Sequence, residues 1–185
     1  MSASNLVKGT AGLSPPCTQY TLLQNLCAHR IAPEVRQKRL EQAECLLNFA
    51  MFLAKLQHDE GRFFVHEHPA GATSWAQPGV QELRALPGVM EIDFDQCRLG
   101  LRIEGSPVKK TTKLLTNSEA VVARFINKRC NCTVPHKVIR GQLADGSGTV
   151  AAHAAWYPDE MCRLLAEAAI IEENRARNSK GLREI

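Results

Sequence analysis

Two short signals in the sequence carry residues that could do chemistry, and each follows an apolar stretch. The first is Ser14-Pro15-Pro16-Cys17, in which two prolines fix the turn that presents a cysteine. A cysteine presented in this way can act as a nucleophile when nearby cations or a helix N-terminus favour its thiolate. The second is Glu67-His68-Pro69, in which a carboxyl group ends an apolar run and could serve as a general acid. We therefore take Cys17 and Glu67 as candidate catalytic residues.

Each of these candidates also has a structural interpretation. Most free cysteines behave as small apolar residues, so Cys17 could simply be packed within a proline turn. Glu67 could cap the turn that follows its strand. His66 and His68 flank Glu67, but alternate residues of a strand share a face, so both histidines should lie on the side opposite Glu67.

A third group of residues has the side chains of a zinc site. Cys130 and Cys132 could bind zinc with His136 and with either Cys97 or His153. One residue separates the first two cysteines, whereas zinc knuckles usually place roughly two to four between them. Because the other ligands also lie at irregular spacing, we treat these as ordinary loop cysteines and expect no metal site and no zinc.

The densest basic cluster is the segment Lys109-Lys110-Thr111-Thr112-Lys113. Lysines with threonine hydroxyls between them suit phosphate contacts without base specificity, although most charge runs only solvate a surface. Trp75 could stack on a base or could belong to the core. The predicted nucleic-acid-binding residues are Arg98, Arg102, Lys109, Lys110, Lys113 and Trp75.

Composition bounds the class of protein. The chain has 185 residues, a net charge of +4 and seven cysteines scattered along its length. The mild positive charge is compatible with a DNA or RNA partner without requiring one. The cysteines are odd in number and scattered along the chain, which favours a reducing compartment. No apolar run is long enough to cross a membrane. We expect an intracellular protein, nuclear or cytoplasmic, with no membrane partner.

The elements that must position these residues alternate between strands and helices. The expected strands are a weak one from residue 5, then 62–67, 89–94, 99–103 and 109–116. The expected helices run from Pro33 to Gln57, and from Ser74, Ser118 and Pro158, with a loop at 130–150. This alternation predicts an α/β fold, with a mostly parallel sheet and flanking helices. Ligands of such sheets bind beyond the carboxyl ends of the strands, where both signals stand. We expect one domain over residues 1–171 and a charged, flexible tail over 172–185.

The order of these motifs resembles the second half of the catalytic domain of DNA cytosine-5 methyltransferases. Pro15-Pro16-Cys17 with Gln19-Tyr20-Thr21 resembles the family's Pro-Cys motif, and Glu67-His68-Pro69 resembles its Glu-Asn-Val motif. The stretch 83–102 is similar to its later Gln-x-Arg-x-Arg region. Together with Tyr157-Pro158 the pattern is also similar to methyltransferase-like segments found beside reverse transcriptases in eukaryotic mobile elements.

The resemblance implies a partial Rossmann-like sheet and a mechanism. Cys17 would attack C6 of a flipped cytosine while Glu67 protonates N3, and S-adenosylmethionine would supply the methyl group. Arg98 and Arg102 would support Glu67 and the phosphates. His68 replaces the motif's asparagine, which puts its role in organising the backbone in doubt.

The donor site is the main departure from the family. No glycine-rich donor loop precedes Pro15, so S-adenosylmethionine is expected only if an upstream N-terminal half completes the domain. Alone, the chain is expected to be an inactive, incomplete methyltransferase-like fragment. The alternatives are a non-catalytic nucleic-acid-binding or scaffolding remnant of a mobile-element protein, and a small zinc-stabilised module.

Overall fold

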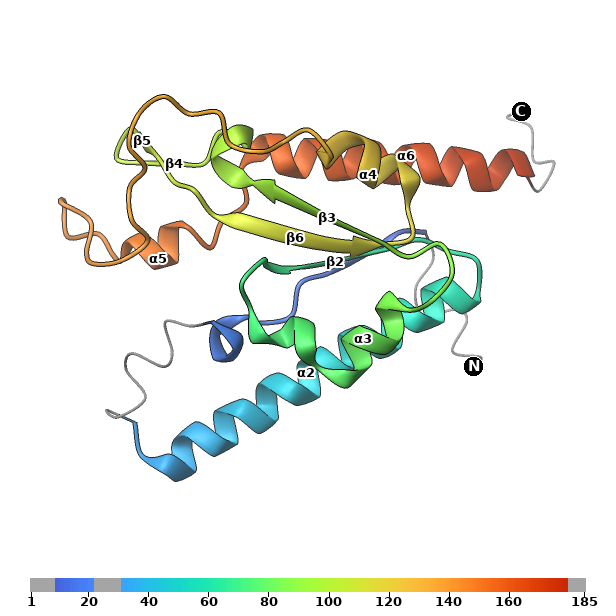
Figure 1. Ribbon diagram of the computed structural model, residues 1–185, viewed down its shortest axis with the longest axis horizontal. Helices are drawn as coiled ribbons and strands as arrows, with labels where there is room; N and C mark the ends of the chain where they lie inside the picture. Colours follow the sequence, from blue (N-terminus) through green and yellow to red (C-terminus); the bar gives the residue numbers. More distant parts are fainter. Residues whose placement is uncertain (1–8, 22–30, 180–185) are drawn as a thin grey trace.

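The protein folds as a mixed β-sheet between two layers of helices, and the computed structural model describes residues 9–21 and 31–179 of the chain (Figure 1). The four strands of the sheet lie in the order β1-β2-β6-β3. They are β1 (Ala11–Leu13), β2 (Phe64–Pro69), β6 (Thr111–Thr116) and β3 (Met90–Asp95). The weak strand predicted from residue 5 begins outside the described residues. The first described strand, β1, comes later in the chain and contains Gly12.

The direction of β6 corrects the predicted topology. β1 and β2 are parallel, but β6 is antiparallel to both of its neighbours, so the prediction of a mostly parallel sheet is wrong. The cause is a hairpin of β4 (Arg102–Ile103) and β5 (Ser106–Pro107). Its turn residues Glu104 and Gly105 have φ of 50° and 76°, the left-handed pair that a tight hairpin requires. The hairpin sends the chain back beside β3, so β6 runs antiparallel to it. The α/β class itself is confirmed.

Helices cover both faces of the sheet. They are α2 (Pro33–Asp59), α3 (Pro78–Arg84), α4 (Glu119–Phe125), α5 (Val150–His153) and α6 (Asp159–Ser179), with 3-10 turns η2 (Thr18–Tyr20), η4 (Thr73–Ala76) and η5 (Gln96–Leu99). Both α2 and α3 begin with a proline, which suits the first position of a helix because an N–H there would have no acceptor within the helix. The helix expected from Ser74 is therefore a 3-10 turn followed by α3. Among the described residues, no helix is both long and apolar enough for a membrane crossing.

The last helix extends beyond the predicted domain boundary. α6 runs to Ser179, so residues 172–179 are helical where a flexible tail was expected. Glu172 is 1% exposed and accepts hydrogen bonds from the Ser118 hydroxyl (2.6 Å) and the Ala120 N–H (3.1 Å). Both donors belong to the N-terminal turn of α4, where unpaired N–H groups need an acceptor. The buried carboxylate therefore ties α6 to α4.

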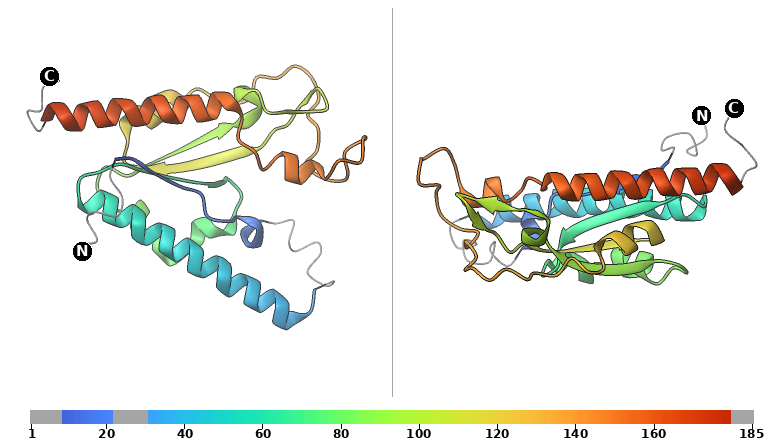
Figure 2. Two further views of the ribbon diagram at one scale, coloured as in Figure 1. Left: turned by 180° about the vertical axis from the view of Figure 1, so that it is seen from behind. Right: turned by 90° about the horizontal axis from the view of Figure 1, so that it is seen from above.

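The apolar core divides into three clusters. α2 and α3 pack on one face of the sheet and α4 and α6 on the other, as Figure 1 and the view from behind in Figure 2 show. A small third cluster lies under the segment that joins α4 to α6: Leu101, Ile103, Val108, Leu143, Val150 and Ala154. The parallel strands β1 and β2 thus stand at one side of the sheet with a helical layer on each face.

Candidate functional site

The parallel strand pair brings the two sequence signals together. In the register of β1 and β2, Leu13 lies opposite His66, so Ser14 leaves β1 beside Glu67. The Ser14 hydroxyl donates a hydrogen bond of 2.8 Å to Glu67 Oε2. Because parallel strands end at the same edge of a sheet, residues far apart in the chain meet there, as predicted from the sequence.

Tyr157 is the third member of this group. Its hydroxyl, carried just before α6, donates to the same Oε2 of Glu67 at 2.5 Å and also contacts the Ser14 hydroxyl. Burial, and then the charge of Glu67, raise the pKa of Tyr157, so the phenol keeps its proton. The other carboxylate oxygen of Glu67 is buried and has no hydrogen-bond partner among the described residues.

Cys17 lies close enough to Glu67 to respond to its charge. The cysteine is half-buried and precedes η2, whose Tyr20 N–H donates to the Cys17 carbonyl at 2.9 Å. Burial raises the pKa of the Cys17 thiol, the charge of Glu67 raises it further, and the cation of Lys110 opposes both. The thiol is therefore held in its protonated form as long as Glu67 is charged.

His68 holds the proline turn from the other face of β2. Its Nε2 lies 2.8 Å from the Pro15 carbonyl and its Nδ1 lies 2.6 Å from the Ser74 hydroxyl. A carbonyl can only accept, so Nε2 carries the proton and Nδ1 accepts from Ser74. Burial lowers the pKa of His68, in keeping with this neutral form. His68 thus organises the backbone of the turn, the role that the sequence had put in doubt.

His66 and Trp75 form a buried layer with His68 beneath the turn. The ring centroids of His66 and Trp75 are 5.2 Å apart, and those of His66 and His68 are 4.9 Å apart. Both histidines lie on the face opposite Glu67, as expected from strand alternation. Trp75 is only 7% exposed and its indole N–H donates to the Pro69 carbonyl at 2.8 Å. The core interpretation of Trp75 therefore holds, and the predicted stacking on a base does not.

The predicted phosphate-binding residues separate into three groups. Lys110 belongs to the site, since its Nζ lies 5.6 Å from the Tyr157 ring centroid and donates to the Ala154 carbonyl at 3.2 Å. Lys113 is engaged on the sheet surface by Glu91 at 3.2 Å and Asp93 at 3.3 Å.

The third group consists of the exposed residues Arg98, Arg102 and Lys109. Arg98 directly follows Cys97 in the chain. The hydrogen bond from the Cys132 N–H lowers the pKa of Cys130, and the charge of Lys109 lowers it further by a smaller amount. The hydrogen-bond partners of Glu67 in the described chain are Ser14 and Tyr157, so the predicted support from Arg98 and Arg102 is not seen.

A cavity of about 310 Å³ opens beside Glu67. Ser14, Glu67 and Tyr157 line it together with apolar side chains of β1, β2, β6 and α6. Its volume falls at the lower end of the range of small-molecule sites, roughly 300–1,000 Å³. The carboxyl group of Glu67 is therefore reachable from a cavity of ligand size.

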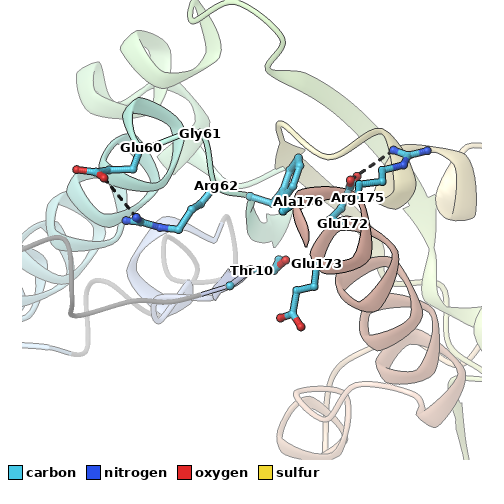
Figure 3. A pocket seen from close by; sticks show the side chains of 10 residues that line it. Thr10, Glu60, Gly61, Arg62, Glu172, Glu173, Arg175 and Ala176 are labelled. Atoms are coloured by element: carbon cyan, nitrogen blue, oxygen red, sulfur yellow. Dashed lines mark hydrogen bonds and ion pairs between the residues drawn. The ribbon is translucent and has the colours of Figure 1, made fainter. Parts of the chain in front are cut away.

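A second hollow of about 530 Å³ lies at the amino ends of β1 and β2 (Figure 3). Four of its five charged side chains pair with one another: Arg62 with Glu60 at 3.5 Å and Arg175 with Glu172 at 3.4 Å. Because the chemistry of a parallel pair lies at the carboxyl ends, we place the candidate site at Cys17 and Glu67.

One group of described residues has the donors for a metal ion: Cys97, Cys130, Cys132 and His136.

Sequence reasoning missed Tyr157 as a site residue, although its Tyr-Pro pair had been noted. No family model matches the chain, and comparisons with curated proteins and with solved structures gave no match.

Proposed function

We propose that this chain is a methyltransferase-like domain related to DNA cytosine-5 methyltransferases, which supplies the nucleophile and the acid and lacks the methyl-donor half. The observation that carries the proposal is the meeting of the Ser14-Pro15-Pro16-Cys17 turn and Glu67 at the carboxyl edge of the parallel strands, where the charge of Glu67 acts on the Cys17 thiol. The Ser14–Glu67 and His68–Pro15 hydrogen bonds fix the turn to both faces of β2.

The two groups form a balanced pair for addition to a pyrimidine. Cys17 gives up its thiol proton to water, and its sulfur forms a bond to C6 of an unstacked cytosine. The electron pair of the C5=C6 bond moves through the ring, and Glu67 delivers a proton to N3. The charge of Glu67 opposes the thiolate. A proton on Glu67 therefore favours both the acid and the nucleophile.

The outer edge of β1 is the place for the missing half. β1 pairs only with β2, so its other edge has no strand partner within the described residues. Such an edge is a template for a further strand from another chain or segment. An upstream half that adds strands there would bring S-adenosylmethionine to the carboxyl edge that holds Cys17. The chain alone should therefore show no binding in a calorimetric titration with S-adenosylmethionine.

A covalent trap tests the nucleophile and acid without the methyl donor. A single-stranded oligonucleotide with pyrimidin-2-one in place of cytosine offers an electrophilic C6 on a base that needs no flipping. We expect an adduct that survives denaturing electrophoresis, that disappears in Cys17→Ser and that decreases in Glu67→Gln. Cys45→Ser is the matched control, because Cys45 is exposed on α2. An adduct no stronger with the wild type than with Cys17→Ser would overturn the proposal.

One observation favours the alternative of a non-catalytic nucleic-acid-binding remnant. Burial and the charge of Glu67 both keep Cys17 protonated, which suits an inert cysteine. This alternative predicts that the oligonucleotide binds reversibly, with equal affinity for wild type and Cys17→Ser, and forms no adduct.

A further inference from the structure

Four potential metal ligands from distant parts of the sequence converge at the end of β3. They are Cys97 on η5, Cys130 and Cys132 after α4, and His136 further along the same segment. Their ligand atoms all lie within 4.8 Å of one another, and Cys130 Sγ lies 3.3 Å from His136 Nε2. A tetrahedral zinc ion, with bonds of about 2.3 Å to sulfur and about 2.0 Å to nitrogen, separates its ligand atoms by roughly 3.5–3.8 Å. The observed cluster therefore has the size of a tetrahedral site.

The segment that carries three of these ligands has no hydrophobic core of its own. None of residues 126–142 is buried, and residues 127–141 form neither helix nor strand. Val134 and Val138 are 52% and 63% exposed. Little apolar burial therefore holds this segment, although the half-buried Ile139 packs against the third cluster. A metal cross-link to Cys97, which is 8% exposed in the body of the domain, would hold the segment in one conformation.

Hydrogen bonds around the cluster position its ligands. The Cys132 N–H lies 3.4 Å from Cys130 Sγ, an arrangement that favours a thiolate. The Cys130 N–H donates to Asp95 Oδ2 at 2.9 Å, and Thr111 donates to Asp95 Oδ1 at 2.6 Å. Asp95 ends β3 and Thr111 begins β6, so the ligand loop is fixed to the sheet at the point where Cys97 follows. Support of this kind is typical of metal sites with oriented ligands.

We propose that Cys97, Cys130, Cys132 and His136 bind one structural zinc ion. Three thiolates and one imidazole form a closed tetrahedral set of soft and borderline ligands, which selects zinc over magnesium or calcium. The bound ion would join η5 to the segment that contains residues 130–136. It would thereby fix the part of the chain that leads to α5 and Tyr157. This inference does not depend on the proposed methyltransferase-like function.

Metal analysis of the full chain, purified without chelators, tests the proposal. We expect about one zinc per chain, and less than about one fifth of that in Cys132→Ser and in His136→Asn. Cys162→Ser is the matched control, because Cys162 is exposed on α6 outside the cluster, and it should keep the full content. Iron in place of zinc, or no metal in the wild type, would overturn the proposal.

A measurement on the wild type alone covers the case in which the variants fail to fold. Removal of zinc with a chelator should make three further thiols reactive towards Ellman's reagent, those of Cys97, Cys130 and Cys132. Cobalt added to the stripped protein should give the visible bands of tetrahedral thiolate coordination at one equivalent. An unchanged thiol count, or a disulfide between two of the three cysteines in the intact mass, would contradict the site.

Discussion

Acidification should destabilise the protein through His66, which lies beneath the candidate site. The imidazole is fully buried between the rings of His68 and Trp75. Burial first, and then the neighbouring His68, lower the pKa of His66 to about 3. An unfolded histidine has a pKa of about 6.5. The unfolded chain therefore binds a proton that the folded protein excludes, and stability is lost as the pH falls below the unfolded pKa.

The size of the effect follows from the linkage relation. The contribution of His66 is fully present above about pH 6.5 and declines by about 1.4 kcal/mol for each further pH unit down to the folded pKa. Between pH 7.5 and pH 5 the free energy of unfolding should therefore fall by about 2 kcal/mol on account of this residue. Urea unfolding at a series of pH values, followed by circular dichroism, measures the decline.

The comparison with His66→Leu isolates this contribution from carboxylates that titrate in the same range. The variant should lose about 2 kcal/mol less than the wild type over that interval, whatever its stability at pH 7.5. His153→Leu is the control, because His153 is exposed and should keep the wild-type slope. Equal slopes for wild type and His66→Leu would show that the imidazole does not stay neutral in the folded protein.

Two further predictions concern the candidate site and the last helix. Glu67→Gln should speed the alkylation of Cys17 by iodoacetamide at pH 8, and Lys110→Met should slow it, because the two charges act oppositely on the pKa of the thiol. Peptide mass spectrometry measures the alkylation rates. Equal rates in the wild type and both variants would show that Cys17 responds to neither charge. Glu172→Ala should lower the free energy of unfolding by about 2–4 kcal/mol, since it leaves buried donors of the α4 N-terminus unpaired. The exposed Glu173→Ala should change it by less than about 0.5 kcal/mol in the same urea titration, and equal effects would contradict the buried role.

The opposite responses expected of Glu67→Gln separate catalysis from simple reactivity. Iodoacetamide needs only a thiolate, so removal of the negative charge should help it. Addition to a pyrimidine also needs a proton donor, which glutamine lacks, so the covalent adduct should decrease. A variant in which both reactions increase would indicate that Glu67 acts on Cys17 only through its charge.

The sequence predicted the candidate pair because its signals are local. An apolar run between Gly61 and Pro69 marks a buried strand, and the proline turn after β1 marks another strand end. It could not predict the direction of β6, since an alternating strand has the same pattern in either direction. The direction depends on the hairpin at Glu104 and Gly105, of whose two-residue strands only the first was expected, within 99–103.

Other errors arose from contacts that only the fold creates. The charge of the stretch after residue 171 predicted a flexible tail. Glu172 instead accepts hydrogen bonds at the start of α4, which is far away in the sequence. Trp75 was predicted to stack on a base although a core position is more common for tryptophan, and only the fold shows its neighbours on β2. The metal ligands were discounted for their irregular spacing, yet Cys97 reaches the others through the end of β3.

The start of β6 links the candidate site to the metal cluster through adjacent residues. Lys110 donates to the Ala154 carbonyl and lies over the Tyr157 ring, and Tyr157 in turn binds Glu67. Thr111 donates to Asp95, which accepts the Cys130 N–H. Lys110 acts on the Cys17 thiol through its charge, and Thr111 acts on the Cys130 backbone through Asp95. The start of β6 therefore fixes the positions of both side chains. A change at the cluster that shifts this strand end should therefore alter the position of Lys110 relative to Tyr157, which makes the alkylation rate of Cys17 a sensitive reporter of both sites.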